Sequence, residues 1–77
     1  MSKYFVMVDY SGLPKRDLDR KIKSMSRNWD GCGFGFGVRD HSFSFKSESA
    51  AEKFVCKVRQ ALGRKVRVSL DHLEEEE

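Results

Sequence analysis

The chain is poor in proline and cysteine, and it lacks any long apolar run. Two cysteines and one proline in 77 residues exclude a dense disulfide scaffold. No apolar segment approaches the roughly 20 residues of a membrane-spanning helix. Residues 1–4 contain no apolar signal-peptide core. We therefore expect a soluble protein of a reducing compartment, the cytoplasm, with no membrane partner.

The length and the distribution of charge predict one small domain. A chain of this size buries only about 60% of its unfolded surface, so its core is thin and leaves little room for a deep catalytic pocket. Residues 1–70 hold all fifteen lysines and arginines but only seven acidic residues, whereas residues 71–77 hold five acidic residues. We expect a single domain over residues 1–70 and an acidic, disordered tail over residues 71–77.

Hydrophobic periodicity predicts the order strand, helix, strand, strand, helix, strand. We expect strands over residues 3–10, 31–38, 41–46 and 65–70, and helices over residues 14–29 and up to residue 62. Ser49 with Glu52, or alternatively Ser47, would cap the second helix. The order is typical of the α+β class and of the ferredoxin-like βαββαβ topology. Right-handed crossovers then place both helices on one face of a four-stranded antiparallel sheet.

Glycine alternates with apolar residues from Gly31 to Val38. A hairpin turn at residues 39–40, or a four-residue loop over residues 38–41, would pair this strand with residues 41–46. Phenylalanines would then face phenylalanines, and glycines would face serines. The predicted pairs are Phe36 with Phe43, Phe34 with Phe45, Gly37 with Ser42, and Gly35 with Ser44. We expect the helix-covered face to hold Tyr4, Val6, Val8, Phe34, Phe36, Phe43, Phe45, Val66 and Val68.

The opposite face of the sheet would be open and nearly bare. Glycine in a strand often marks the close approach of another backbone or a ligand. This face is therefore a candidate contact surface for a partner or for a second copy of the chain. It is expected to hold Phe5, Met7, Gly33, Gly35, Gly37, Ser42, Ser44 and Arg67.

The element order and an outward aromatic on the first strand resemble RNA-recognition-motif domains, which stack bases on their open sheet face. Phe5, within Tyr4-Phe5-Val6-Met7-Val8, looks like the outward aromatic of their first-strand motif. Residues 33–38 resemble their third-strand motif in letters, but they fall on the second strand here. The third strand offers Ser42 and Ser44 where that family has stacking aromatics. The resemblance therefore carries an RNA-contacting role to Phe5 alone.

The first predicted helix carries a stripe of positive charge opposite its apolar face. Its cations recur at spacings of four, three and four residues, with no acid among them, so they share one helix face. Such a stripe can contact phosphates or an acidic protein surface. We expect binding through it to depend strongly on salt and weakly on sequence. The residues are Arg16, Arg20, Lys23 and Arg27, which we call the basic stripe.

Neither a metal site nor an active site is predicted. Cys32, His41, Cys56 and His72 are zinc-binding residue types, but successive separations of nine, fifteen and sixteen residues leave no close pair. His41 is expected in the hairpin turn beside Asp40, with no nucleophile near it. The glycines match no phosphate-binding loop, since GxxxxGK[ST] is absent. We expect a protein that is not an enzyme and has no cofactor.

These observations favour a small binding, adaptor or inhibitor-type protein. It would dock on a macromolecular partner through the basic stripe, the open sheet face, or both. The alternative is a nucleic-acid-binding protein that uses the basic stripe on RNA or DNA phosphates. A homodimer formed through the bare sheet faces or the edge strands is a third hypothesis. In its compactness and charge segregation the chain resembles small phage-type or accessory proteins that bind host machinery.

Overall fold

The computed structural model describes residues 2–74. Its elements are β1 (Ser2–Ser11), α1 (Arg16–Ser24), β2 (Trp29–Gly35), β3 (Val38–Phe45), α2 (Glu48–Leu62), a short 3-10 helix η1 (Gly63–Lys65) and β4 (Arg67–Glu74). The strands form one four-stranded sheet in the order β2-β3-β1-β4, and each neighbouring pair is antiparallel. The predicted α+β class, with two helices and a four-stranded antiparallel sheet, is confirmed.

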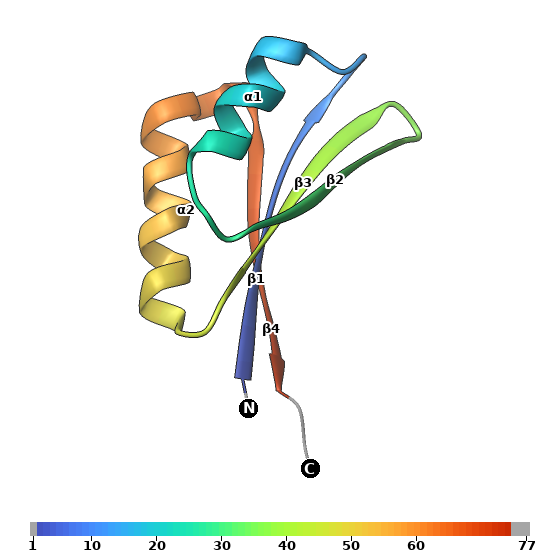
Figure 1. Cartoon of the computed structure of the whole chain (residues 1–77). Helices are drawn as coiled ribbons and strands as arrows, with labels where there is room; N and C mark the ends of the chain where they lie inside the picture. Colours follow the sequence, from blue (N-terminus) through green and yellow to red (C-terminus); the bar gives the residue numbers. More distant parts are fainter. Residues whose placement is uncertain (1, 75–77) are drawn as a thin grey trace.

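Both helices lie on the same side of the sheet, and the other side is open (Figure 1). The strongly twisted strands extend beyond the helix layer at both ends, most clearly at the β2–β3 hairpin. The molecule is elongated, with a longest dimension of 40 Å and a shortest dimension of 19 Å. Phe34, which lies near the β2–β3 turn, is therefore half exposed.

The core forms where β1, β3 and the two helices meet. Alternation along β1 directs Val6, Val8 and Tyr10 to the helix side, and Phe43 of β3 packs on Phe54 of α2 with ring centroids 4.4 Å apart. The apolar stripe of α2 supplies most of the rest. The buried hydrophobic residues are Val6, Val8, Tyr10, Ile22, Phe43, Phe45, Ala51, Phe54, Val55, Val58, Leu62 and Val66.

The ends of the helices have identifiable causes. The side chain of Ser47 accepts a hydrogen bond from the backbone N–H of Ala50 at 3.2 Å, so Ser47 rather than Ser49 caps α2. Gly63 ends α2 with a φ of 54°, a conformation that other residues rarely adopt. Helix α1 ends earlier than predicted, at Ser24, and Lys57 of α2 donates a hydrogen bond to the carbonyl of Met25 beyond it.

The predicted hairpin register is wrong. The turn lies at Phe36-Gly37, three residues before the predicted turn, and Gly35 pairs with Val38. Both turn residues have positive φ, 52° and 74°, as in the two-residue turns whose twist suits a hairpin. Glycine adopts this conformation freely, whereas a turn at Arg39-Asp40 would have placed two side chains in it.

The new register moves three aromatic residues and one histidine relative to the prediction. Phe34 pairs with Arg39, beyond the helix layer, and Phe36 lies at the turn, so neither belongs to the core. His41, predicted at the turn, is instead in the middle of β3 and only 1% exposed. Trp29, predicted within the first helix, begins β2 and packs against the core opposite Phe43. The predicted pairs Gly37 with Ser42 and Gly35 with Ser44 do not form.

The last strand is longer than predicted. β4 continues from Arg67 to Glu74, four residues beyond its predicted end, and its whole length pairs with β1. The boundary predicted between residues 70 and 71 therefore does not coincide with the end of the strand, and residues 75–77 of the predicted tail lie outside the described residues. No helix within residues 2–74 is long and apolar enough to cross a membrane.

Candidate functional site

Helix α1 is held on the sheet by polar contacts around one carboxylate, Asp19. Tyr10 donates its hydroxyl hydrogen to Oδ1 of Asp19 at 2.6 Å and accepts one from the backbone N–H of Lys15 at 2.8 Å. Nε of Arg39 lies 3.2 Å from Oδ2 of the same carboxylate. Ile22 is the one fully buried residue of α1. These polar contacts therefore help to orient this short helix on the sheet.

His41 extends the same network to β2. The indole Nε1–H of Trp29 can only donate, so it gives its hydrogen to Nδ1 of His41 at 3.1 Å. The proton of the neutral ring must then be on Nε2, which donates to Oδ1 of Asp19 at 2.9 Å. Nζ of Lys23 lies 4.5 Å from the centre of the Trp29 ring, within the range of a cation–π contact. The network thus fixes one member of the basic stripe against the sheet.

The network shifts the protonation of its members. Burial alone would raise the pKa of Asp19, but hydrogen bonds from Tyr10 and His41 and the charge of Arg39 outweigh it and lower that pKa. Burial and the nearby Asp19 carboxylate raise the pKa of the Tyr10 hydroxyl. Asp19 is therefore ionised and Tyr10 neutral across the physiological range, and the hydrogen bonds persist there.

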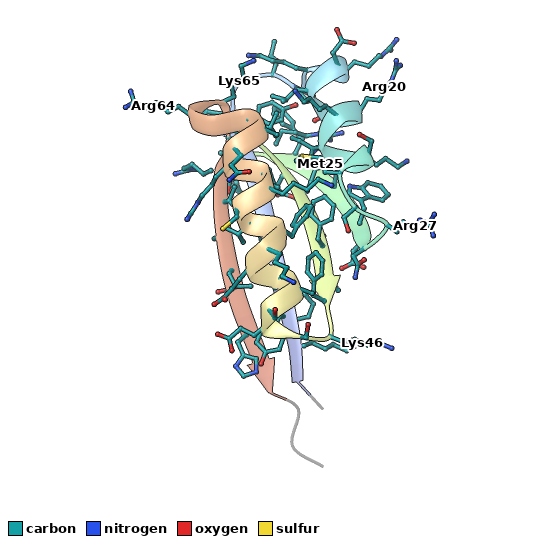
Figure 2. All side chains as sticks on the ribbon, turned by 90° about the vertical axis from the view of Figure 1, so that its left-hand side faces the viewer. Arg20, Met25, Arg27, Lys46, Arg64 and Lys65 are labelled. Carbon is teal, nitrogen blue, oxygen red and sulfur yellow. The ribbon has the colours of Figure 1, made fainter. Side chains whose placement is uncertain are left out.

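The structure divides the basic stripe between a helix and a turn. Arg16, Arg20 and Lys23 are exposed on α1, whereas Arg27 follows the end of α1 in the turn before β2. Figure 2 shows Arg20 and Arg27 pointing outward on the α1 side of the molecule. No ion pair links any of these four cations to an acid within residues 2–74. Arg16, Arg20 and Arg27 are therefore available to an anionic partner, while Lys23 also contacts the Trp29 ring.

Three exposed apolar residues lie on the β2–β3 hairpin and in the loop after β1, which meet at one end of the molecule. The backbone N–H of Gly12 donates to the carbonyl of Gly37 at 2.8 Å, which joins the two loops. Leu13 in that loop is 79% exposed, Phe34 is 49% exposed, and Phe36 is fully exposed. We call Leu13, Phe34 and Phe36 the apolar tip. Exposed large apolar side chains that gather in one place often mark an interaction site.

The open sheet face brings together most of the residues predicted for it. Across the sheet, Ser42 pairs with Met7, and Ser44 pairs with Phe5; Phe5 and Met7 are partly buried. Gly33 and Gly35 lie on this face at the β2 edge, while Gly37 is in the turn instead.

The part of this face toward the β2–β3 turn is more polar than the sequence analysis indicated. Asp9 lies opposite Asp40 on β3 and opposite Arg67 on β4. Nε of Arg67 donates to Asp9 at 3.0 Å. A Cβ at Gly33 would lie 3.3 Å from Oδ1 of Asp40, so glycine makes room for that carboxylate. The face therefore carries charge as well as bare backbone.

No metal constellation is assembled in the part of the chain that the structure describes. Within residues 2–74 no three ligand-type side chains gather as a metal site would require. Cys32 and Cys56 are exposed free thiols on different elements. His41 beside Asp19 has the partners of a catalytic base, but Trp29 and Asp19 occupy both ring nitrogens. The pair therefore links α1 to β3.

Sequence reasoning missed the apolar tip and the Asp19 network. The signal for the tip is Phe36-Gly37 itself, since glycine as the second residue of a two-residue turn is common in hairpins. The network has no short-range signal, because Tyr10, Asp19, Trp29 and His41 come from four elements.

Comparisons with known proteins add no further constraint. No protein-family model, no curated protein and no solved structure matches the chain. The function is therefore argued from the surfaces described above.

Proposed function

We propose that the chain is a small non-catalytic binding protein of ferredoxin-like topology that docks on an anionic surface of a macromolecular partner, in the first place a protein. The element order and the sheet order β2-β3-β1-β4 support this topology. The docking residues are the basic stripe on the α1 side of the molecule and the apolar tip. The stripe supplies long-range attraction to negative charge, and the tip supplies apolar anchors.

The observation that carries this proposal is Phe36. A bulky aromatic residue with a φ of 52° is unfavourable, and here its side chain is also fully exposed. An asparagine before Gly37 would suit the turn better. A bulky residue that adopts a positive φ and does not contribute to the core is expected at a functional position. Phe36 therefore supports the tip as a contact that becomes buried against a partner.

The test is an affinity capture from cell lysate with three variants of the tagged protein. Phe36→Asn removes the exposed ring, and Arg20→Glu combined with Arg27→Glu reverses the stripe. Lys46→Glu is the matched control, because Figure 2 shows Lys46 at the opposite end of α2 from Lys65. We expect the wild type and the control to retain a discrete partner that the other two variants lose. Retention of the same partner by all variants would exclude both surfaces.

A second candidate function is the binding of single-stranded nucleic acid. It is favoured by the presence of two exposed phenylalanines and of cations outside the ion pairs of residues 2–74, since bases stack on aromatic rings while phosphates contact lysine and arginine. Nuclease treatment of the lysate separates the candidates, because capture through nucleic acid would be lost. Fluorescence anisotropy with labelled RNA and DNA is the direct measurement. The absence of binding at low salt would end this candidate.

The open sheet face is tested separately with Gly35→Val. No atom lies within 4 Å of the position that a Cβ at Gly35 would take, so the substitution fits the structure. If the face contacts a partner or a second copy of the chain, this variant is expected to lose capture or to become a monomer. Unchanged capture and unchanged sedimentation would confine docking to the basic stripe and the apolar tip.

A further inference from the structure

A second positively charged site lies on the helix layer, between the start of α1 and the end of α2. It is a depression of about 640 Å³, within the range of small-molecule sites. Four of its lining residues are cations and one is an acid. The lining residues are Lys15, Arg16, Asp17, Leu18, Lys21, Leu62 and Lys65. Only Arg16 is shared with the basic stripe.

Three parts of the chain bring these cations together. Lys15 precedes α1, Lys21 lies on α1, and Lys65 ends η1 after the reversal at Gly63. Gly63 has a φ of 54°, so this reversal depends on glycine. Figure 2 shows Lys65 at the α1 end of the molecule and Lys46 at the far end. Three of the four cations thus come from residues 15–21, and the fold brings Lys65 to them from a distant part of the chain.

The positive charge of this depression exceeds the negative charge, since four cations and one acid, Asp17, line it. Within residues 2–74 no acid forms an ion pair with Lys15, Arg16, Lys21 or Lys65. Four like charges around one hollow repel one another, and a multivalent anion would relieve that repulsion. The N-terminal end of α1 adds partial positive charge, and its cap residue Lys15 makes no side-chain hydrogen bond to it.

We propose that this depression binds a phosphate-bearing ligand, with the phosphate groups contacting Lys15, Lys21 and Lys65. Leu62, which is buried, and the partly buried Leu18 form an apolar wall that an organic body attached to the phosphate can contact. Asp17 is the one opposing charge and limits the affinity. Two sources of such a ligand are free pyrophosphate and the phosphorylated end of a nucleic-acid strand. Both carry several negative charges close together.

The experiment is an NMR titration of the ¹⁵N-labelled full chain with sodium pyrophosphate at fixed ionic strength. We expect saturable shifts of backbone amides around residues 15–18 and 62–65. Lys65→Ala and Lys21→Ala should each weaken binding about fivefold, the effect of one exposed ion pair. Asp17→Asn should strengthen it about threefold. Lys46→Ala, the matched control, should leave the affinity unchanged.

Two further arms distinguish the sources of phosphate. A 5′-phosphorylated oligonucleotide that binds more tightly than pyrophosphate and than its unphosphorylated form indicates a strand end, whereas tighter binding of pyrophosphate indicates a free ligand. The proposal is overturned if no probe gives saturable shifts, if both oligonucleotides bind equally and more tightly than pyrophosphate, or if Lys46→Ala weakens binding as much as Lys65→Ala. Loss of docking in the Arg20 and Arg27 variant leaves this site intact, so the two proposals fail separately.

Discussion

Two residues, Asp19 and Phe36, show how stability and binding are separated in this protein. Asp19 orients α1, whereas Phe36 is exposed in an unfavourable backbone conformation. Asp19 accepts from Tyr10 and His41 and is paired with Arg39, so one carboxylate joins α1 to β1 and β3. Phe36 contributes nothing comparable to the folded state, because its ring lies wholly in solvent. Stability and binding therefore depend on different residues and can be changed separately.

Phe36→Asn is expected to raise the free energy of unfolding by about 0.5–1 kcal/mol, since Asn-Gly suits a two-residue turn with positive φ at both positions. Urea denaturation followed by circular dichroism measures this change. Phe34→Ser is the comparison: its position lies outside the turn, so the stability should stay within about 0.5 kcal/mol of the wild type. A marked destabilisation by Phe36→Asn would mean that the ring packs against the protein.

At the scale of elements, the sequence determines the type and order of the helices and strands better than their register. A glycine–apolar alternation keeps its period of two wherever the turn is placed, so it does not locate the turn. Phe36-Gly37 favours the turn locally, and the burial of His41 against Trp29 and Asp19, which are distant in sequence, stabilises the same register. Helix α2 was predictable because its apolar spacing and its end at Gly63 are local signals.

The cap of α2 offers an element-scale test, because the sequence left two serines as candidates. Ser47→Ala should lower the free energy of unfolding by about 1 kcal/mol, since its side chain accepts from the N–H of Ala50. Ser49→Ala is the matched control, and alanine within a helix should be neutral or slightly favourable. Thermal denaturation of both variants decides between them, and the opposite ranking would move the start of the helix.

At the scale of the whole molecule, the polar network makes stability depend on pH at both extremes. The pKa of Asp19 is lower in the folded state than its ordinary value of 3.8. Its contribution is therefore complete above that value and is lost as pH falls through the folded pKa. The pKa of Tyr10 is raised above 10.0, so the stability that its proton provides is complete below that value and is lost as pH rises through the folded pKa.

Asp19→Asn should consequently lower stability at pH 7 and flatten the acid limb of the stability profile. The loss is expected to be about 3 kcal/mol, because His41 and Arg39 would lose their ionised partner. Chemical denaturation at a series of pH values between 2 and 7 provides the measurement. An acid limb as steep in the variant as in the wild type would assign the pH dependence to other carboxylates.

The central position of β1 also has a consequence for the order in which the sheet can form. Phe5 pairs with Ser44 on one side and with Asp71 on the other, so both neighbours of β1 come from distant parts of the chain. Long loops must close before either pairing contributes, which slows folding. The β2–β3 hairpin closes through two residues only. It can therefore form first, and its phenylalanines are then exposed on a partly folded chain.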